Sequence, residues 1–107
     1  MKKYIKTNGI LPDTDFQKGD IVVLENRNMK LIMILDNVGY HGQLDILSRT
    51  WICVSEDETP YLRHVENQDG VIWHNNAVLR DATLQEYQEL IKALSENLPK
   101  GTYELNQ

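Results

Sequence analysis

The chain has 107 residues, a formal net charge of −5 and 25% charged residues, which excludes a disordered chain and fits one globular domain. The negative charge argues against a broad basic face for binding a phosphate backbone. A single cysteine, Cys53, excludes an intrachain disulfide, and the longest apolar run, Leu31 to Leu35, is too short for a membrane span. We expect one soluble, cytoplasmic domain over residues 1–107, without membrane attachment.

The first part of the chain reads as turns followed by strands. Residues 1–15 carry the turn signals Asn8-Gly9 and Pro12-Asp13, and are expected to hold one short strand or to be partly disordered. Strand-forming runs then begin at Ile21 and at Met29, separated by a polar stretch, which predicts a β-hairpin. The unbroken run LIMIL within the second strand predicts a central strand that is covered on both faces.

The middle of the chain leaves alternatives open. Apolar runs at 44–47 and 51–54 predict one long bent strand or a second hairpin that turns at 48–50. The acidic sequence SEDE at 55–58 predicts a loop. The segments YLRHV and VIWH flank Asp69-Gly70, a hairpin turn signal, although a short helix over 60–66 is an alternative.

One amphipathic helix is predicted over residues 83–98. Thr83 is a suitable N-cap, and Glu86 three residues later completes a capping box. We expect the main apolar stripe to close the core. If Leu90 and Leu98, which flank this stripe, are exposed, we expect a homodimer contact there. The main stripe recurs at spacings of three, four and three: Leu84, Tyr87, Ile91 and Leu94.

These elements indicate an α+β fold that is mainly β. Residues 16–80 would form a small, strongly bent antiparallel sheet or an SH3-like barrel of five to six strands. The C-terminal helix would close that sheet or barrel, and residues 102–105 would add a last short strand.

Two segments resemble a known group of proteins. FQKGDIVVLEN at 16–26 and RDATLQEYQELIKAL at 80–94 are similar to the barrel start and the terminal Arg-x-Ala-Thr-x-x-Glu helix of small accessory proteins of Bacteroidetes-type gut bacteria and their phages. The resemblance implies a phage-related or mobile-element accessory protein and implies no activity. That group includes inhibitors of host defence.

Catalytic and metal-binding motifs are not evident in the sequence. His41, His64 and His74 with Cys53 could supply zinc ligands only by converging from separate strands, because none has ligand spacing. A nucleophilic pair of Cys53 with a histidine is the sharpest enzyme hypothesis, but Cys53 lies in an apolar strand sequence, where a buried thiol is common. We expect no catalytic residue, no metal and no cofactor.

A set of aromatic residues and one arginine forms the candidate binding site. In small barrels such side chains can stack bases or grip a peptide. The alternative is that Trp51 and Trp73 fill the core. The candidates are Tyr40, Trp51, Tyr61, Arg63 and Trp73.

Three functions remain open on the sequence. The first is a non-catalytic module for protein–protein interaction. The second is a nucleic-acid-associated accessory protein that uses the aromatic and arginine residues. The third is an acidic inhibitor of a nucleic-acid-binding partner, based on the charge of −5 and the loop at 55–58.

Overall fold

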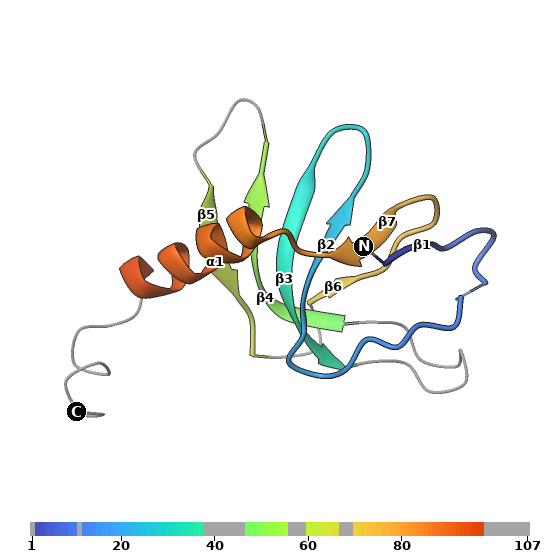
Figure 1. Cartoon of the computed structure of the whole chain (residues 1–107), viewed down its shortest axis with the longest axis horizontal. Coiled ribbons are helices and arrows are strands. Elements are labelled where there is room, and N and C mark those ends of the chain that lie inside the picture. The colour runs from blue at the N-terminus through green and yellow to red at the C-terminus, as the bar shows by residue number, and fades with distance from the viewer. Residues whose placement is uncertain (1, 11, 38–46, 56–59, 67–69, 98–107) are drawn as a thin grey trace.

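The computed structural model describes residues 2–10, 12–37, 47–55, 60–66 and 70–97 (Figure 1). These residues form seven strands followed by one helix. In chain order the elements are β1 (Lys3–Ile5), β2 (Ile21–Glu25), β3 (Lys30–Asn37), β4 (Leu47–Val54), β5 (Tyr61–His64), β6 (Val71–Ile72), β7 (Val78–Asp81) and α1 (Leu84–Asn97).

All described strand pairs are antiparallel and belong to one sheet. Its order is β1-β7-β2-β3-β4-β5, and β6 pairs with β4 beside this path. The α+β class, the antiparallel sheet and the terminal helix are confirmed. The described residues form seven strands: six of them, β2 to β7, fall in the region where five to six were predicted, and β1 precedes that region. The sheet is open, because β1 and β5 lie at its two ends and no described residues join them, so the described strands do not close into an SH3-like barrel.

The predicted β2–β3 hairpin is confirmed, from Ile21 opposite Ile34 to Glu25 opposite Lys30. Its turn is organised by Asn26, whose side-chain oxygen accepts hydrogen bonds from the amides of Asn28 and Met29. This use of asparagine to close a turn on its own backbone is the reason the residue favours turns.

The segment after the hairpin resolves the open alternatives. Residues 47–54 form one long strand with a bulge opposite Leu35, so a hairpin turning at 48–50 is wrong. The predicted pairing of YLRHV with VIWH is also wrong. Both strands pair with the same edge of β4, β5 with Thr50–Cys53 and β6 with Leu47–Ser48, so that β6 continues the line of β5.

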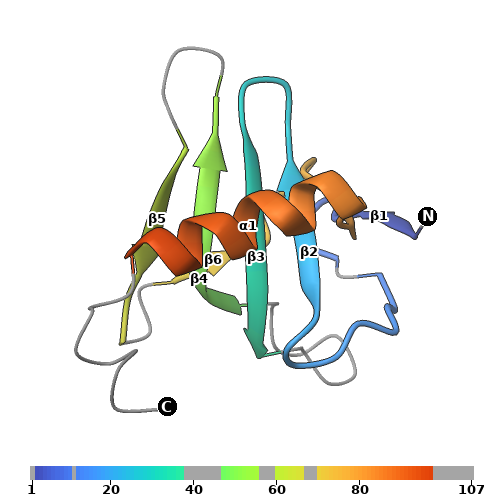
Figure 2. The same ribbon diagram turned by 60° about the vertical axis from the view of Figure 1, so that its left-hand side comes forward.

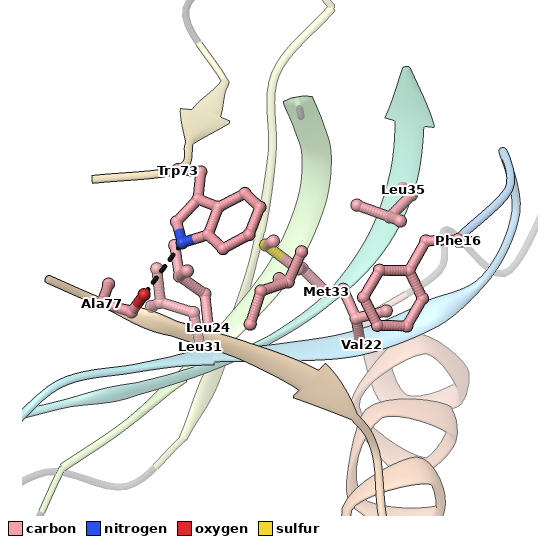
Figure 3. Close-up of a cluster of buried hydrophobic side chains, with 9 residues drawn as sticks. Phe16, Val22, Leu24, Leu31, Met33, Leu35, Trp73 and Ala77 are labelled. Carbon is pink, nitrogen blue, oxygen red and sulfur yellow. Dashed lines mark hydrogen bonds between the residues drawn. The ribbon is translucent and has the colours of Figure 1, made fainter. Parts of the chain in front are cut away.

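The two faces of the sheet carry separate cores. Alternate side chains of β2 and β3 point to opposite faces, which explains why the LIMIL run is apolar throughout: Leu31, Ile32, Met33 and Leu35 are all buried. Helix α1 covers one face and crosses β2, β3, β4 and β5 (Figure 2). The other face packs against Phe16, Trp73 and Ala77 (Figure 3).

The N-terminal segment is attached to the sheet through β1. The predicted short strand near the N-terminus is confirmed, and it pairs Lys3, Tyr4 and Ile5 with β7. The Tyr4 ring meets the Phe16 ring edge-on at 5.5 Å between centroids, so the N-terminal segment contributes to the second core. The expected strand at 102–105 lies outside the described residues.

Candidate functional site

The structure brings three of the five predicted binding residues onto one face of the β4–β5 pair. Trp51 on β4 lies opposite Arg63 on β5, and Tyr61 lies two residues before Arg63 and therefore on the same face. Trp51 is half-buried against the core, whereas Tyr61 and Arg63 are exposed. We call Trp51, Tyr61 and Arg63 the β5 surface. Tyr40 lies outside the described residues.

Trp73 does not belong to this surface, which corrects the prediction. Its side chain is 1% exposed and lies in the core beside β2 and β3 (Figure 3). The indole Nε1 donates a hydrogen bond of 2.9 Å to the carbonyl oxygen of Ala77, so the one polar atom of the ring is satisfied inside the protein. The alternative that Trp73 fills the core is therefore confirmed. Because its ring is buried, it cannot stack on a ligand.

The polar end of the β5 surface is held in a fixed arrangement. The Arg63 guanidinium lies 4.7 Å from the centroid of the Tyr61 ring, which is the geometry of a cation–π contact. Nη2 of Arg63 also donates a 2.6 Å hydrogen bond to the Tyr61 hydroxyl. A positive charge is therefore positioned over an aromatic ring on the outermost strand.

The backbone of β5 presents an edge on the side away from β4. The amide of Val65 donates to the carbonyl of Arg49 across the β4–β5 pair at 2.9 Å. Because inward and outward positions alternate along an antiparallel strand, the N–H and C=O groups of Leu62 and His64 face outward. No described strand lies on that side. Such an edge is a template for a further strand.

The sheet separates the residues of the proposed nucleophilic pair. Cys53 lies opposite Tyr61 and packs towards the Trp73 core, whereas His64 lies opposite Thr50 on the face covered by α1. His64 Nδ1 and Thr50 Oγ1 are 2.7 Å apart and hydrogen bonded. Cys53 and His64 therefore do not meet, and His41 lies outside the described residues. Within the described ranges no three histidine, cysteine or acidic side chains are grouped to hold a metal.

A buried ionic cluster joins the start of α1 to the sheet. Arg80 on β7 contacts Glu86 through Nη1 and Nη2 at 2.7 and 2.8 Å, and contacts Glu25 on β2 through Nε at 2.8 Å. Lys30 on β3 adds a 2.9 Å contact to Glu86. Hydrogen bonds from the Arg80 side chain hold the pKa of the Glu86 carboxyl well below its usual range, although burial acts in the opposite direction. Separate hydrogen bonds from Arg80 to Glu25 lower the pKa of that carboxyl group as well.

The capping box is confirmed and is part of this cluster. The amide of Thr83 donates to Glu86 Oε1 at 2.9 Å, and the amide of Glu86 donates to Thr83 Oγ1 at 3.2 Å. One carboxylate thus caps the helix and neutralises Arg80. The sequence signalled the cap, but it gave no signal for the ion pairs, because Glu25 and Arg80 are 55 residues apart.

The predicted role of the helix stripe is wrong for most of its length. Leu84, Tyr87 and Ile91 are 72%, 45% and 38% exposed. The face that covers the sheet contains Leu90 and Ala93 instead, and it is continuous with the buried Glu86. Leu90 is fully buried, so it is not available for the homodimer contact, and Leu98 lies outside the described residues.

One hollow of the described surface lies between polar turns. A hollow of about 450 Å³ lies between the β2–β3 turn and the β6–β7 turn, where Asn26, Arg27, Asn28, Asn75 and Asn76 line it. Asn75 accepts a hydrogen bond from the amide of Gly9, and Asn76 adopts the left-handed backbone conformation with φ of 67°. These asparagines thus serve the turns themselves.

Comparisons with known proteins give no further assignment. No protein-family model, no curated protein and no solved structure matches this chain. No helix among the described residues is long and apolar enough to cross a membrane. The acidic residues 56–58 of the loop at 55–58, which the inhibitor hypothesis uses, lie outside the described residues.

Proposed function

We propose that this protein is a non-catalytic binding module that captures an extended segment of a partner protein along β5. The observation that carries the proposal is the outward-facing backbone of Leu62 and His64 beside the β5 surface. Peptides that add as a strand to a sheet edge gain affinity from such main-chain groups and specificity from alternate side chains.

The side chains of the β5 surface indicate the chemistry of that segment. A strand added to β5 would direct every second side chain to the face that carries Tyr61 and Arg63. The guanidinium of Arg63 suits a carboxylate there, and the rings of Tyr61 and Trp51 suit an apolar neighbour. We therefore propose a partner segment that carries an acidic and an apolar residue at alternate positions.

A peptide fits this surface better than a nucleic acid does. The net charge of −5 repels a polyanion. It acts only weakly on a single carboxylate, because charges farther from that carboxylate than the Debye length of about 8 Å are screened by salt. Of the described residues in the predicted stacking set, Trp51, Tyr61 and Arg63 share the surface, and Trp73 is buried. The likeness to phage and mobile-element accessory proteins supports a setting in which such a module blocks or recruits a host protein.

The test uses a proline that removes one outward amide. His64→Pro deletes the N–H that a partner strand needs while leaving the inward bonds to β4 in place, and proline is tolerated on edge strands. The matched control is His64→Ala, which loses the same hydrogen bond to Thr50 but keeps the amide. Peptides of about 10 residues, close to the upper limit of strand length, would be selected from a displayed random library against the purified protein.

The expected result is a set of selected peptides with an acidic residue next to an apolar position. They should bind the wild type and His64→Ala alike, and bind His64→Pro and Arg63→Glu at least about tenfold more weakly, which is about 1.4 kcal/mol. Equal binding to His64→Pro, or an empty selection, would overturn the proposal. Tighter binding of a single-stranded DNA or RNA oligonucleotide than of any peptide would favour the nucleic-acid alternative.

A further inference from the structure

Helix α1 exposes an apolar stripe that the fold does not use. Leu84, Tyr87 and Ile91 are exposed on one flank of the helix, and half-buried Leu94 continues their line. Their spacing of three, four and three residues is the narrow repeat of a helix that packs against another helix, rather than the wider stripe of a helix lying on a sheet. The core of this protein uses the neighbouring face, which contains Leu90 and Ala93.

The amount of exposed apolar surface on this stripe is larger than scattered surface residues provide. The exposed fractions of the three side chains correspond to about 300 Å² of surface on a single helix face, which is the size of the patches that mark interaction sites on monomers. Helix α1 lies over one face of the sheet (Figure 2), and Trp51 of the β5 surface packs against the core on the opposite face, so the patch does not depend on the function proposed above.

The charges around the stripe do not oppose contact with a second copy of the chain. Two molecules with a charge of −5 each would repel if acidic residues lay on the contact. The residues directly beside the stripe on its exposed side, Gln88 and Ser95, are neutral. The charged residues Glu89, Lys92 and Glu96 lie farther around the helix, so no like charges would meet across two such stripes.

The stripe is also self-complementary about a two-fold axis. If two helices pack antiparallel with the axis passing beside residue 89, Leu84 faces Leu94 of the second copy, and Tyr87 faces Ile91 of the second copy. Both pairs share this axis, which is the requirement for an isologous contact. Antiparallel packing also places opposite ends of the helix dipoles together.

We propose that this protein forms a two-fold homodimer through antiparallel contact of the Leu84, Tyr87 and Ile91 stripes. The contact area sets the expected strength. About 300 Å² of apolar side chain on each copy is less than half of the roughly 800 Å² per partner of a standard interface. The dimer should therefore be weak, with a dissociation constant on the order of 10–100 μM, and should form reversibly with concentration.

Sedimentation velocity of the full chain over a concentration series tests the association. The wild type should shift from monomer towards dimer as its concentration passes through this range. Leu84→Glu should remain monomeric, because it places a charge on each end of the contact. The matched control is Ile10→Glu, since Ile10 is also 72% exposed but lies in the turn after β1; it should associate as the wild type does.

Cysteine cross-linking tests the geometry independently of affinity. In a Cys53→Ala background, Gln88→Cys lies beside the axis and should form a disulfide dimer on mild oxidation. Gln85→Cys, three residues away and off the contact, should do so at least about tenfold more slowly. Circular dichroism would verify that each variant is folded. A wild type that stays monomeric throughout, equal disruption by Ile10→Glu, or equal cross-linking at 85 and 88 would overturn the proposal.

Discussion

Replacing Glu86 with glutamine should lower the free energy of unfolding, because it removes one buried charge while it keeps the helix cap. Glutamine also completes a capping box, because its side-chain oxygen accepts the hydrogen bond from the Thr83 amide in place of the Glu86 carboxylate. Arg80, which is 8% exposed, would keep Glu25 at 2.8 Å but lose its bidentate partner. Breaking a buried ion pair costs about 3–5 kcal/mol, and the remaining Glu25 reduces this to about 2–3 kcal/mol of unfolding free energy at pH 7.

The pH dependence identifies the charge as the cause. The folded protein holds the pKa of Glu86 below its usual range, so its contribution is fully present above the pKa of the unfolded chain, about 4.3, and is lost as the pH falls towards the folded value. The glutamine variant has no such group. The difference in unfolding free energy between the wild type and the glutamine variant should therefore shrink by about 1.5 kcal/mol as the pH falls from 7 to 3.

Urea unfolding followed by tryptophan fluorescence at several pH values measures both quantities. Trp73 is buried in the folded protein and becomes exposed on unfolding, so its emission reports the transition. A difference below about 0.5 kcal/mol at pH 7 would show that the Arg80 cluster does not stabilise the fold. A difference that stays constant from pH 7 to pH 3 would show that the effect comes from packing and not from the charge.

Four further substitutions test the other assignments by the same unfolding assay. Leu90→Ala should cost about 2–5 kcal/mol, whereas Leu84→Ala should change stability by less than about 0.5 kcal/mol in dilute solution, and similar costs would contradict the helix orientation. Trp73→Phe should cost about 1–3 kcal/mol because it leaves the Ala77 carbonyl without its partner, and a neutral change would contradict a buried hydrogen bond. Thr83→Ala should cost about 1 kcal/mol with little change between pH 5 and pH 8, and a pH-dependent loss would mean that the cap and the ion pairs are not separable.

The sequence predicted the local features of this fold well. The β2–β3 hairpin follows from two strand-forming runs around an asparagine turn, and the start of α1 follows from Thr83 and Glu86. Each depends on residues within a few positions of one another, where turn and cap preferences act. The burial of both faces of β3 was also predictable, since an uninterrupted apolar strand must be covered on both sides.

The features that depend on distant residues were not predictable. Placing the apolar stripe towards the sheet assumed that the most regular repeat marks the core, whereas Leu90 on the neighbouring helix face packs in one cluster with Ile32 and Ile52 of the sheet. The pairing of β5 and β6 with one edge of β4 had no local signal either. Of the candidate site, the sequence identified Trp51, Tyr61 and Arg63 by residue type, but it could not separate them from Trp73.

The position of β7 between β1 and β2 has a consequence for how the protein is made. The strands β2 to β5 follow one another and can pair as soon as each emerges from the ribosome, because their contacts are close in sequence. The edge of β2 that β7 will occupy stays open until residue 81 has been synthesised, and β1 has no partner before then. The nascent chain therefore passes through a stage with an unprotected, strongly apolar strand edge, which is where a chaperone would engage it and where aggregation would begin.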